Sequence, residues 1–232
     1  MIQVEGIFSG GGGSSISAPI IGKDFNWTGG DGTYQVLDDG DGNWRIKFLS
    51  SGTFTPLKDM VIDVFLVGAG GGGSAAGAGA GYTNTTKSVV LAAGTSYSIE
   101  IGSGGTPGES YSSGTAGGNT SAFSATANGG FGGGGTLSPS GGNGGSGGGA
   151  KDANGGIDGA NGSSAGDYKG GTGQGTTTRE FGESTGDLYA SGGSGVSSGA
   201  AAGADNTGDG GDRVKAGGSG IVIIRKHKEA AA

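Results

Sequence analysis

The chain has 232 residues, 63 of them glycine, a net charge of −7 and no cysteine. The missing cysteines exclude a disulfide scaffold and thiolate metal sites. The acidic balance argues against nucleic acid, whose phosphates bind clustered lysine and arginine, and provides no basic face for anionic lipid. Apolar runs such as residues 64–67 are far too short to cross a membrane. Neither a nucleic acid nor a membrane is therefore expected as a partner.

The first 24 residues predict an attachment arm followed by a flexible linker. Residues 1–7 alternate apolar and other residues, and residues 10–15 are glycine and serine only. Met1 is followed by neither a basic nor an apolar region, so no secretion signal is expected and the chain would be made in the cytoplasm of its host cell.

Residues 25–101 predict a domain rich in β-strands. Residues 33–37 and 44–49 carry apolar and aromatic residues on both sides of an acidic, glycine-containing turn, which is typical of a hairpin. Residues 60–67 predict a central, mostly buried strand. Residues 87–91 and 96–101 predict a second hairpin around residues 92–95. No segment has helical periodicity long enough to predict a helix.

Residues 102–220 form a glycine-rich zone with polar spacers, and residues 221–232 form a closing β-strand and a tail. Between Gly68 and Gly220, 51 of 153 residues are glycine, too many for an ordinary apolar core. Such a segment is either a disordered linker or a structure held by backbone contacts that glycine permits. The closing strand favours order, because its expected pairing with residues 61–67 would tie both ends of the zone to one sheet.

Extended polyproline-II-type helices of glycine, with about 3 residues per turn, can lie side by side and hydrogen-bond to one another. Collagen is excluded, because its strict three-residue repeat is missing and the chain has only four prolines. The expected fold is all-β plus polyglycine II, with essentially no α-helix: a small antiparallel sheet or sandwich anchors a bundle of glycine-rich helices. Gly144, Gly145, Gly147, Gly148 and Gly149 should lie in an interior helix, where Gly148→Val would cost about 1–3 kcal/mol.

Two motifs imitate binding sites. Residues 68–73 satisfy a dinucleotide-binding glycine pattern, but no helix follows and Ser88 stands where the acidic residue is required. Residues 39–43 resemble the start of a calcium loop, yet Trp44 replaces the glycine that such a loop requires and Ser50 replaces the acid. A hairpin turn is the simpler interpretation, with a bound cation in this loop left open. No cofactor and no metal are expected.

The sequence also predicts that the protein is not an enzyme. The single histidine, His227, lies in the expected frayed tail, so a Ser-His-Asp arrangement on ordered elements is not expected.

Several large side chains stand among the glycines. We expect Phe123, Phe131 and Phe181 to pin the boundary between the sheet and the glycine zone. Tyrosines at turns instead suit recognition, because they combine contact area with a polar tip. For the tyrosines of the glycine zone, a structural role and a binding role are both open.

Three segments resemble the glycine-rich domains of phage and prophage tail-fibre and tail-tip proteins. They are residues 62–73, residues 96–105 and the closing residues 217–225; residues 32–49 and 176–183 are similar to further blocks of such proteins. Together they cover most of residues 25–225. A vertebrate receptor kinase also carries a related glycine-rich domain, so the fold alone does not fix the ligand.

The resemblance implies a tail-fibre tip adhesin of a virion or a phage-derived particle. The loops between the glycine-rich helices would bind a bacterial surface glycan or an outer protein. The N-terminal arm would bind other tail subunits, and a homo-oligomer such as a trimer stays open. The alternatives are a structural decoration protein without a ligand and, less well supported by the irregular charged spacers, an ice-binding protein.

Because one end of the bundle is tied to the sheet, alternate spacers should gather at the free end. The candidate receptor-binding residues carry aromatic rings, charges of both signs and an amide: Glu109, Tyr111, Asp152, Asn154, Asp167, Tyr168, Lys169 and Tyr189.

Overall fold

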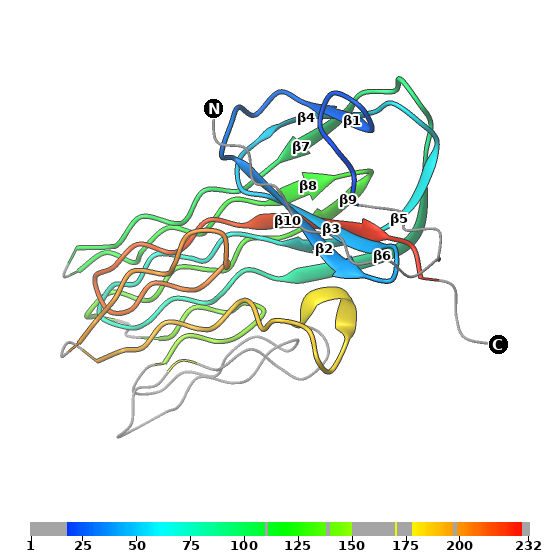
Figure 1. Ribbon diagram of the computed structural model, residues 1–232. Helices are drawn as coiled ribbons and strands as arrows, with labels where there is room; N and C mark the ends of the chain where they lie inside the picture. Colours follow the sequence, from blue (N-terminus) through cyan, green and yellow to red (C-terminus); the bar gives the residue numbers. More distant parts are fainter. Residues whose placement is uncertain are drawn as a thin grey trace.

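The computed structural model describes residues 18–109, 111–137, 140–149, 170, 178–196 and 199–228. Figure 1 shows the strands gathered at one end, with extended segments running side by side away from them. The described residues confirm the all-β class, and their only helical element is a short 3-10 turn, η1 (Glu180–Gly182).

Two antiparallel five-stranded sheets form the strand end of the molecule. The first has the order β1 (Phe25–Trp27), β4 (Gly52–Pro56), β7 (Tyr97–Glu100), β8 (Thr120–Ala122) and β9 (Ala125–Ala127). The second has the order β2 (Tyr34–Gly40), β3 (Asn43–Phe48), β10 (Ile221–Lys226), β5 (Met60–Val67) and β6 (Thr83–Leu91).

A single apolar core lies between the two sheets. Alternate residues of the strands point into it, as the two-residue period of a strand requires. On β5 these are Ile62, Val64 and Leu66, all fully buried, and Phe48 of β3 meets Phe54 of β4 with ring centroids 5.6 Å apart. We call this two-layer unit the sandwich.

Both strand pairings expected of the second sheet are confirmed. β2 and β3 form the predicted hairpin, with Tyr34 opposite Phe48. β5 is an interior strand between β10 and β6, and it pairs with β10 from Ile221 opposite Val67 to Lys226 opposite Ile62. Both strands are buried on both faces, which explains their nearly continuous apolar sequence.

The predicted hairpin of residues 87–91 and 96–101 is wrong. β6 pairs with β5 in the second sheet, whereas β7 pairs with β4 and β8 in the first. Residues 92–96 therefore carry the chain from one sheet to the other. The turn-forming sequence was recognised, but a local turn does not determine which sheet the next strand joins.

The outer face of the second sheet is covered by residues 178–190. Phe181 and Tyr189 pack on Phe65, with ring centroids 6.0 and 5.6 Å away, in a second apolar cluster that also holds Ile223. Residues 18–24, which the sequence assigned to the arm and linker, lie on the sandwich: Ala18 packs against the core and Asp24 pairs with Lys58 at 2.8 Å.

The extended segments begin at Gly68, directly after β5, and not at residue 102. In the described chain they lie within residues 68–82, 102–109, 111–119, 128–137, 140–149, 190–196 and 199–220, which we call the glycine bundle; some of these ranges hold two segments joined by a turn. Backbone hydrogen bonds join these segments to one another, and these hydrogen bonds lie outside the two β-sheets.

Residues 68–73 lie at the centre of the bundle, and their hydrogen bonds repeat every three residues. The N–H groups donate in turn to carbonyl groups of three neighbouring segments. Gly68 donates to Tyr82 and Gly71 to Gly79 in the first segment. Ala69 donates to Gly118 and Gly72 to Thr115 in the second, and Gly70 donates to Gly218 and Gly73 to Lys215 in the third. Carbonyl groups of the same residues accept from three further segments, through the N–H groups of Gly105, Gly108, Gly130, Gly133 and Gly211. Six segments therefore surround this one.

The close spacing of the segments explains the glycines. A Cβ atom added to Gly70 would lie 1.9 Å from the carbonyl oxygen of Asp209, and one added to Gly72 would lie 2.0 Å from that of Thr106. The run predicted to be interior is buried as expected: a Cβ on Gly148 would lie 2.1 Å from the Gly77 oxygen. Any side chain larger than hydrogen at these positions would force the backbones apart.

Candidate functional site

The end of the bundle that points away from the strands is formed by turns that meet around Ser74. Ser74 is fully buried in the turn that ends the central segment. Its backbone carbonyl accepts a hydrogen bond from the Val214 N–H at 3.0 Å, and its hydroxyl donates to the Ser112 carbonyl at 2.6 Å. A Cβ on Gly135 would lie 2.6 Å from the Tyr111 carbonyl oxygen, which places the turn after Gly135 beside the same group.

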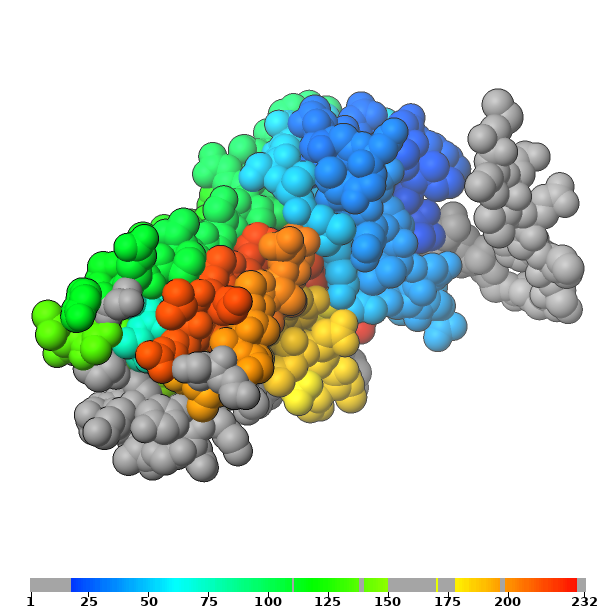
Figure 2. Space-filling view, turned by 90° about the vertical axis from the view of Figure 1, so that its left-hand side faces the viewer, coloured from blue at the N-terminus to red at the C-terminus, as the bar shows by residue number. Residues whose placement is uncertain are grey.

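These turns expose large apolar side chains. Tyr111 is 77% exposed, Leu137 84% and Val214 51%, and each lies in a different turn of the free end. Figure 2, which faces this end, shows the green segments of the chain beside the orange ones. We call this surface the tip; it is formed by Glu109, Tyr111, Leu137, Arg213, Val214 and Lys215.

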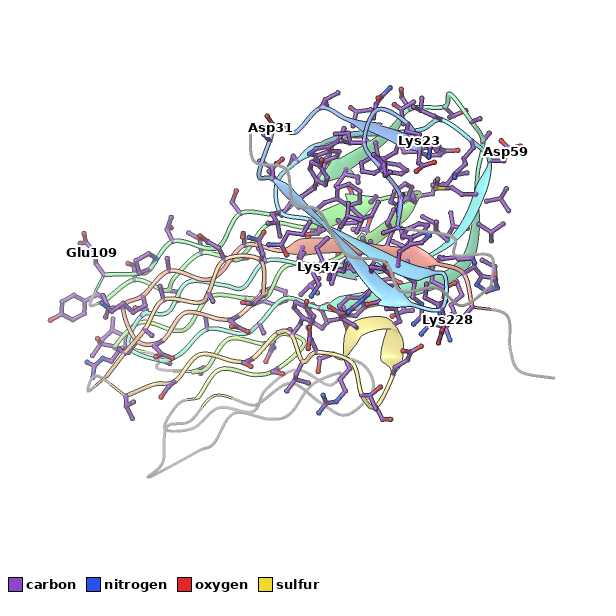
Figure 3. The ribbon with its side chains drawn as sticks, in the orientation of Figure 1. Lys23, Asp31, Lys47, Asp59, Glu109 and Lys228 are labelled. Carbon is purple, nitrogen blue, oxygen red and sulfur yellow. The ribbon has the colours of Figure 1, made fainter. Side chains whose placement is uncertain are left out.

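Charges of both signs accompany the apolar residues of the tip. Glu109, Arg213 and Lys215 are exposed in the same turns as Tyr111 and Val214. Figure 3 shows Glu109 at the free end, whereas Lys47 lies at the strand end. An apolar centre with charged neighbours is the usual composition of a protein-binding surface.

Val214 is strained. Its φ angle is +56°, in the left-handed region that a β-branched residue rarely occupies. The turn is nevertheless fixed by hydrogen bonds on both sides, since Arg213 N–H donates to the Ser194 carbonyl and Val214 N–H to that of Ser74. Strain held in place by surrounding structure is a common property of functional turns.

Of the eight candidate residues, the structure places two at the tip. Glu109 and Tyr111 lie there as expected, in a turn where Ser112 N–H donates to the Glu109 carbonyl. Five candidates lie outside the described residues, namely Asp152, Asn154, Asp167, Tyr168 and Lys169.

Tyr189 lies away from the tip and is 7% exposed, so it carries the structural role that the sequence left open. Its hydroxyl donates to Glu180 Oε1 at 2.8 Å, and Lys47 Nζ lies 3.0 Å from the same hydroxyl. Burial is the largest cause that raises the pKa of Tyr189, which reaches about 12. The ring and its charged partners fasten residues 178–190 to the second sheet.

Glu180 is the centre of that cluster. Its buried carboxylate pairs with Lys47 Nζ at 2.7 Å and with Arg45, which also binds Asp39 at 2.9 Å. The hydrogen bond to Asp39 is the largest cause that raises the pKa of Arg45. The Asp39 carboxylate of the suspected calcium loop is thus engaged by Arg45. Among the described residues, no group of three or more acidic or histidine side chains could hold a metal ion.

The phenylalanines expected at the boundary divide into two groups. Phe123 and Phe181 are buried, at 9% and 4% exposure, as predicted. Phe131 is 57% exposed on the bundle, so the prediction that it is a pin is wrong. The neighbours of Phe131 are other extended segments that leave no apolar pocket for a ring: its N–H donates to Asn143 and its carbonyl accepts from Gly79.

The expectation of a frayed tail at His227 is also wrong. The His227 N–H donates to the Val61 carbonyl, and Nδ1 lies 2.6 Å from Asp63. The argument against a Ser-His-Asp arrangement therefore loses its basis.

Sequence reasoning missed Leu137 and Val214. Leu137 lies in one of the polar spacers between glycine runs, and an apolar residue in such a spacer is the signal that could have identified it. Val214 follows an acidic cluster, and its left-handed backbone cannot be read from the sequence. In the described residues no helix has the length and apolar character needed to cross a membrane.

Comparison of the chain with known proteins identifies its family. No curated protein sequence matches the chain. The family model of the glycine-rich domain matches residues 49–227, which span most of both the sandwich and the glycine bundle. The chain therefore belongs to the glycine-rich domain family.

Proposed function

We propose that the chain is the tip adhesin of a phage or phage-derived tail fibre, and that the tip binds a receptor on the bacterial surface. The observation that carries the proposal is the exposure of Tyr111, Leu137 and Val214 together at the free end of the bundle. A protein without a ligand gains nothing from a tyrosine that is 77% exposed in a lattice of backbones. The resemblance to tail-tip proteins supports the same function.

The bundle suits the task as a rigid support. We propose that its segments are polyglycine-II helices, because the hydrogen bonds of residues 68–73 repeat every three residues, as in a helix with about 3 residues per turn. Six hydrogen-bonded neighbours hold the central segment in place, so the turns at its end keep one arrangement. A preorganised surface binds with less loss of entropy than flexible loops.

The receptor would be a surface glycan or an outer protein of the bacterium. The tip combines an aromatic ring, aliphatic groups, a carboxylate and two cations, which suits either class of ligand. We propose that the N-terminal residues, which lie outside the described chain, bind other tail subunits. The protein would then be located in the tail of the particle.

The test is retention of the purified chain by cell-surface preparations from a panel of bacteria. Once a preparation retains the wild type, the variants Tyr111→Ala and Leu137→Ser should bind at least about tenfold more weakly, as residues at the centre of an interface do. The matched control is Val90→Ser, because Val90 is 72% exposed on β6 in the sandwich. The control should bind like the wild type.

Two results would contradict the proposal. If both tip variants are retained as well as the wild type, the binding surface lies elsewhere. If no preparation in a broad panel retains the wild type, the alternative of a structural decoration protein is favoured.

A further inference from the structure

Three residues far apart in the sequence form a hydrogen-bonded chain at the strand end. Asp63 of β5 lies with Oδ1 2.6 Å from His227 Nδ1, and His227 Nε2 lies 3.1 Å from the Ser88 hydroxyl. The carboxylate and the hydroxyl thus occupy opposite nitrogens of one imidazole. This is the arrangement in which a histidine acts as the base for a serine nucleophile and a carboxylate orients the ring.

The environment of Asp63 fixes its carboxylate in position to bind the imidazole ring of His227. It is fully buried, and its other oxygen accepts a hydrogen bond from Arg225 Nε at 3.0 Å. Burial alone would raise the pKa of Asp63, but hydrogen bonds from His227, the Ser88 N–H and Arg225 outweigh it and lower that pKa. The ionised carboxylate accepts from Nδ1–H, which leaves the lone pair of Nε2 directed at Ser88.

Ser88 lies at an irregularity of the sheet. The pairing of β5 with β6 shifts register between Ile62 and Val64, and the φ angle of Ser88 is +58°. A left-handed serine in a strand is energetically unfavourable, and bulges of this kind redirect side chains beside active sites. The Ser88 N–H donates to Asp63 at 3.1 Å, so the bulge and the hydrogen-bonded chain are parts of one arrangement.

A pocket of about 610 Å³ opens beside Ser88 and His227. Trp44, Met60, Val61 and Val90 provide apolar lining, and the charged lining is Lys226, Asp59 and Lys58, which pairs with Asp24. Its volume is within the range of small-molecule sites, about 300–1,000 Å³. Asp59, which also lines the pocket, lies at the end of the molecule opposite Glu109 of the tip (Figure 3).

We propose that Ser88 and His227 are a nucleophile and its base, positioned by Asp63, and that this site hydrolyses carboxylic esters of small acyl groups bound in the pocket. The inference does not depend on the proposed receptor binding, since the tip and the pocket lie at opposite ends. An ester fits better than an amide, because its alkoxide leaving group needs less assistance than an amine.

The reaction proceeds in two balanced steps. Ser88 Oγ attacks the carbonyl carbon while its proton moves to His227 Nε2, and the carbonyl electron pair moves onto the carbonyl oxygen. The intermediate collapses, the C–O bond to the alcohol breaks, His227 protonates the leaving oxygen, and the acyl group stays on Ser88 Oγ. Water then attacks acyl-Ser88 with His227 again as base, and releases the carboxylic acid and free Ser88.

The test begins with a fluorophosphonate probe, which forms an adduct only with an activated serine. The folded wild-type chain should be labelled at Ser88, as located by peptide mass spectrometry, and should hydrolyse p-nitrophenyl acetate. Ser88→Ala should lose both signals, and His227→Gln should slow labelling at least about 100-fold, the usual contribution of a general base. Ser96→Ala is the matched control, since Ser96 is an exposed serine whose hydroxyl lies 3.0 Å from the Thr55 hydroxyl.

Asp63→Asn tests the positioning role. Ester hydrolysis should show a lower kcat at an unchanged KM, because the amide no longer orients the imidazole toward Ser88, whereas a carboxylate that only stabilises the fold would leave kcat of the folded variant unchanged.

An unlabelled Ser88 in the folded wild type would overturn the proposal without any variant. The same holds if Ser88→Ala hydrolyses the ester at the wild-type rate. In either case the hydrogen-bonded chain only fastens the residue after β10 to the sheet, and Ser88→Ala would change thermal stability alone.

Discussion

The sandwich and the glycine bundle are two solutions to the same problem of ordering a chain. In the sandwich, side chains such as Phe48 and Phe54 exclude water between two sheets. In the bundle, the absence of side chains lets backbones such as that of Gly72 approach one another and satisfy their hydrogen bonds directly. The first region should therefore be weakened by removing atoms, and the second by adding them.

The largest effect is expected from emptying the sandwich core. Phe48 is fully buried and its ring lies 4.7 Å from that of Trp27 between centroids, so Phe48→Ala should lower the free energy of unfolding by about 3–5 kcal/mol. Chemical denaturation measures this value. Val90→Ala, at a 72% exposed position, is the control and should stay within about 0.5 kcal/mol.

The next effect concerns the buried charge that joins the end of β10 to β5. Asp63→Asn removes the buried carboxylate that faces Arg225, whose side chain is 5% exposed and keeps Glu183 at 2.5 Å as an anionic partner, and should cost about 2–3 kcal/mol near neutral pH. Because the folded-state pKa of Asp63 is lowered, its contribution is complete above the unfolded pKa of about 3.9 and is lost as the pH falls through the folded value.

Unfolding free energies of the wild type and Asp63→Asn should therefore converge below about pH 4. Asp31→Asn, at an exposed carboxylate, is the matched control. A gap between wild type and Asp63→Asn that is independent of pH would show that the charge of Asp63 is not responsible.

Adding a methyl group should weaken the bundle. Gly72→Ala would place a Cβ 2.0 Å from the Thr106 carbonyl oxygen, and overpacking of this kind costs about 1–3 kcal/mol. Gly94→Ala is the informative comparison, because Gly94 has open space around it and only its φ of +73° opposes a side chain. If Gly72→Ala is no more harmful than Gly94→Ala in denaturation, the contact between backbones does not stabilise the bundle.

The smallest effect should be a gain. Val214→Gly removes the strain of a left-handed backbone at a β-branched residue, which costs about 1–2 kcal/mol. The same change destabilises the folded state by about 0.5–1 kcal/mol, because glycine has more conformational freedom in the unfolded chain. Thermal unfolding should thus show a stabilisation of up to about 1 kcal/mol. A clear loss of stability would mean that the Val214 side chain packs against the bundle rather than serving the surface.

The sequence was most informative where local chemistry decides the structure. Turn residues between residues 37 and 44 determine the β2–β3 hairpin, and β-branched runs identify β5 and β10 as buried partners. The sequence was uninformative where a segment far away in the chain determines which contacts a residue makes. The side chain of Asp63 meets residue 227, 164 positions away, and nothing local to His227 indicates that contact.

The candidate site shows the same limit. Tyr111 and Glu109 could be placed at the free end, because the chain must turn between extended segments. Tyr189 resembles Tyr111 in its glycine-rich surroundings, yet it is buried by Phe65, Lys47 and Glu180, which come from other parts of the chain. Exposure of an isolated aromatic residue therefore depends on tertiary neighbours that composition does not reveal.

Native-state hydrogen exchange tests most directly whether backbone hydrogen bonds alone order the bundle. The amides of Gly70, Gly71, Gly72 and Gly73 should exchange as slowly as those of β5, because each donates to a neighbouring segment at 2.8–2.9 Å and can exchange only when the bundle opens. Exchange of these four amides at the rate of an unstructured glycine peptide, while β5 stays protected, would contradict the account.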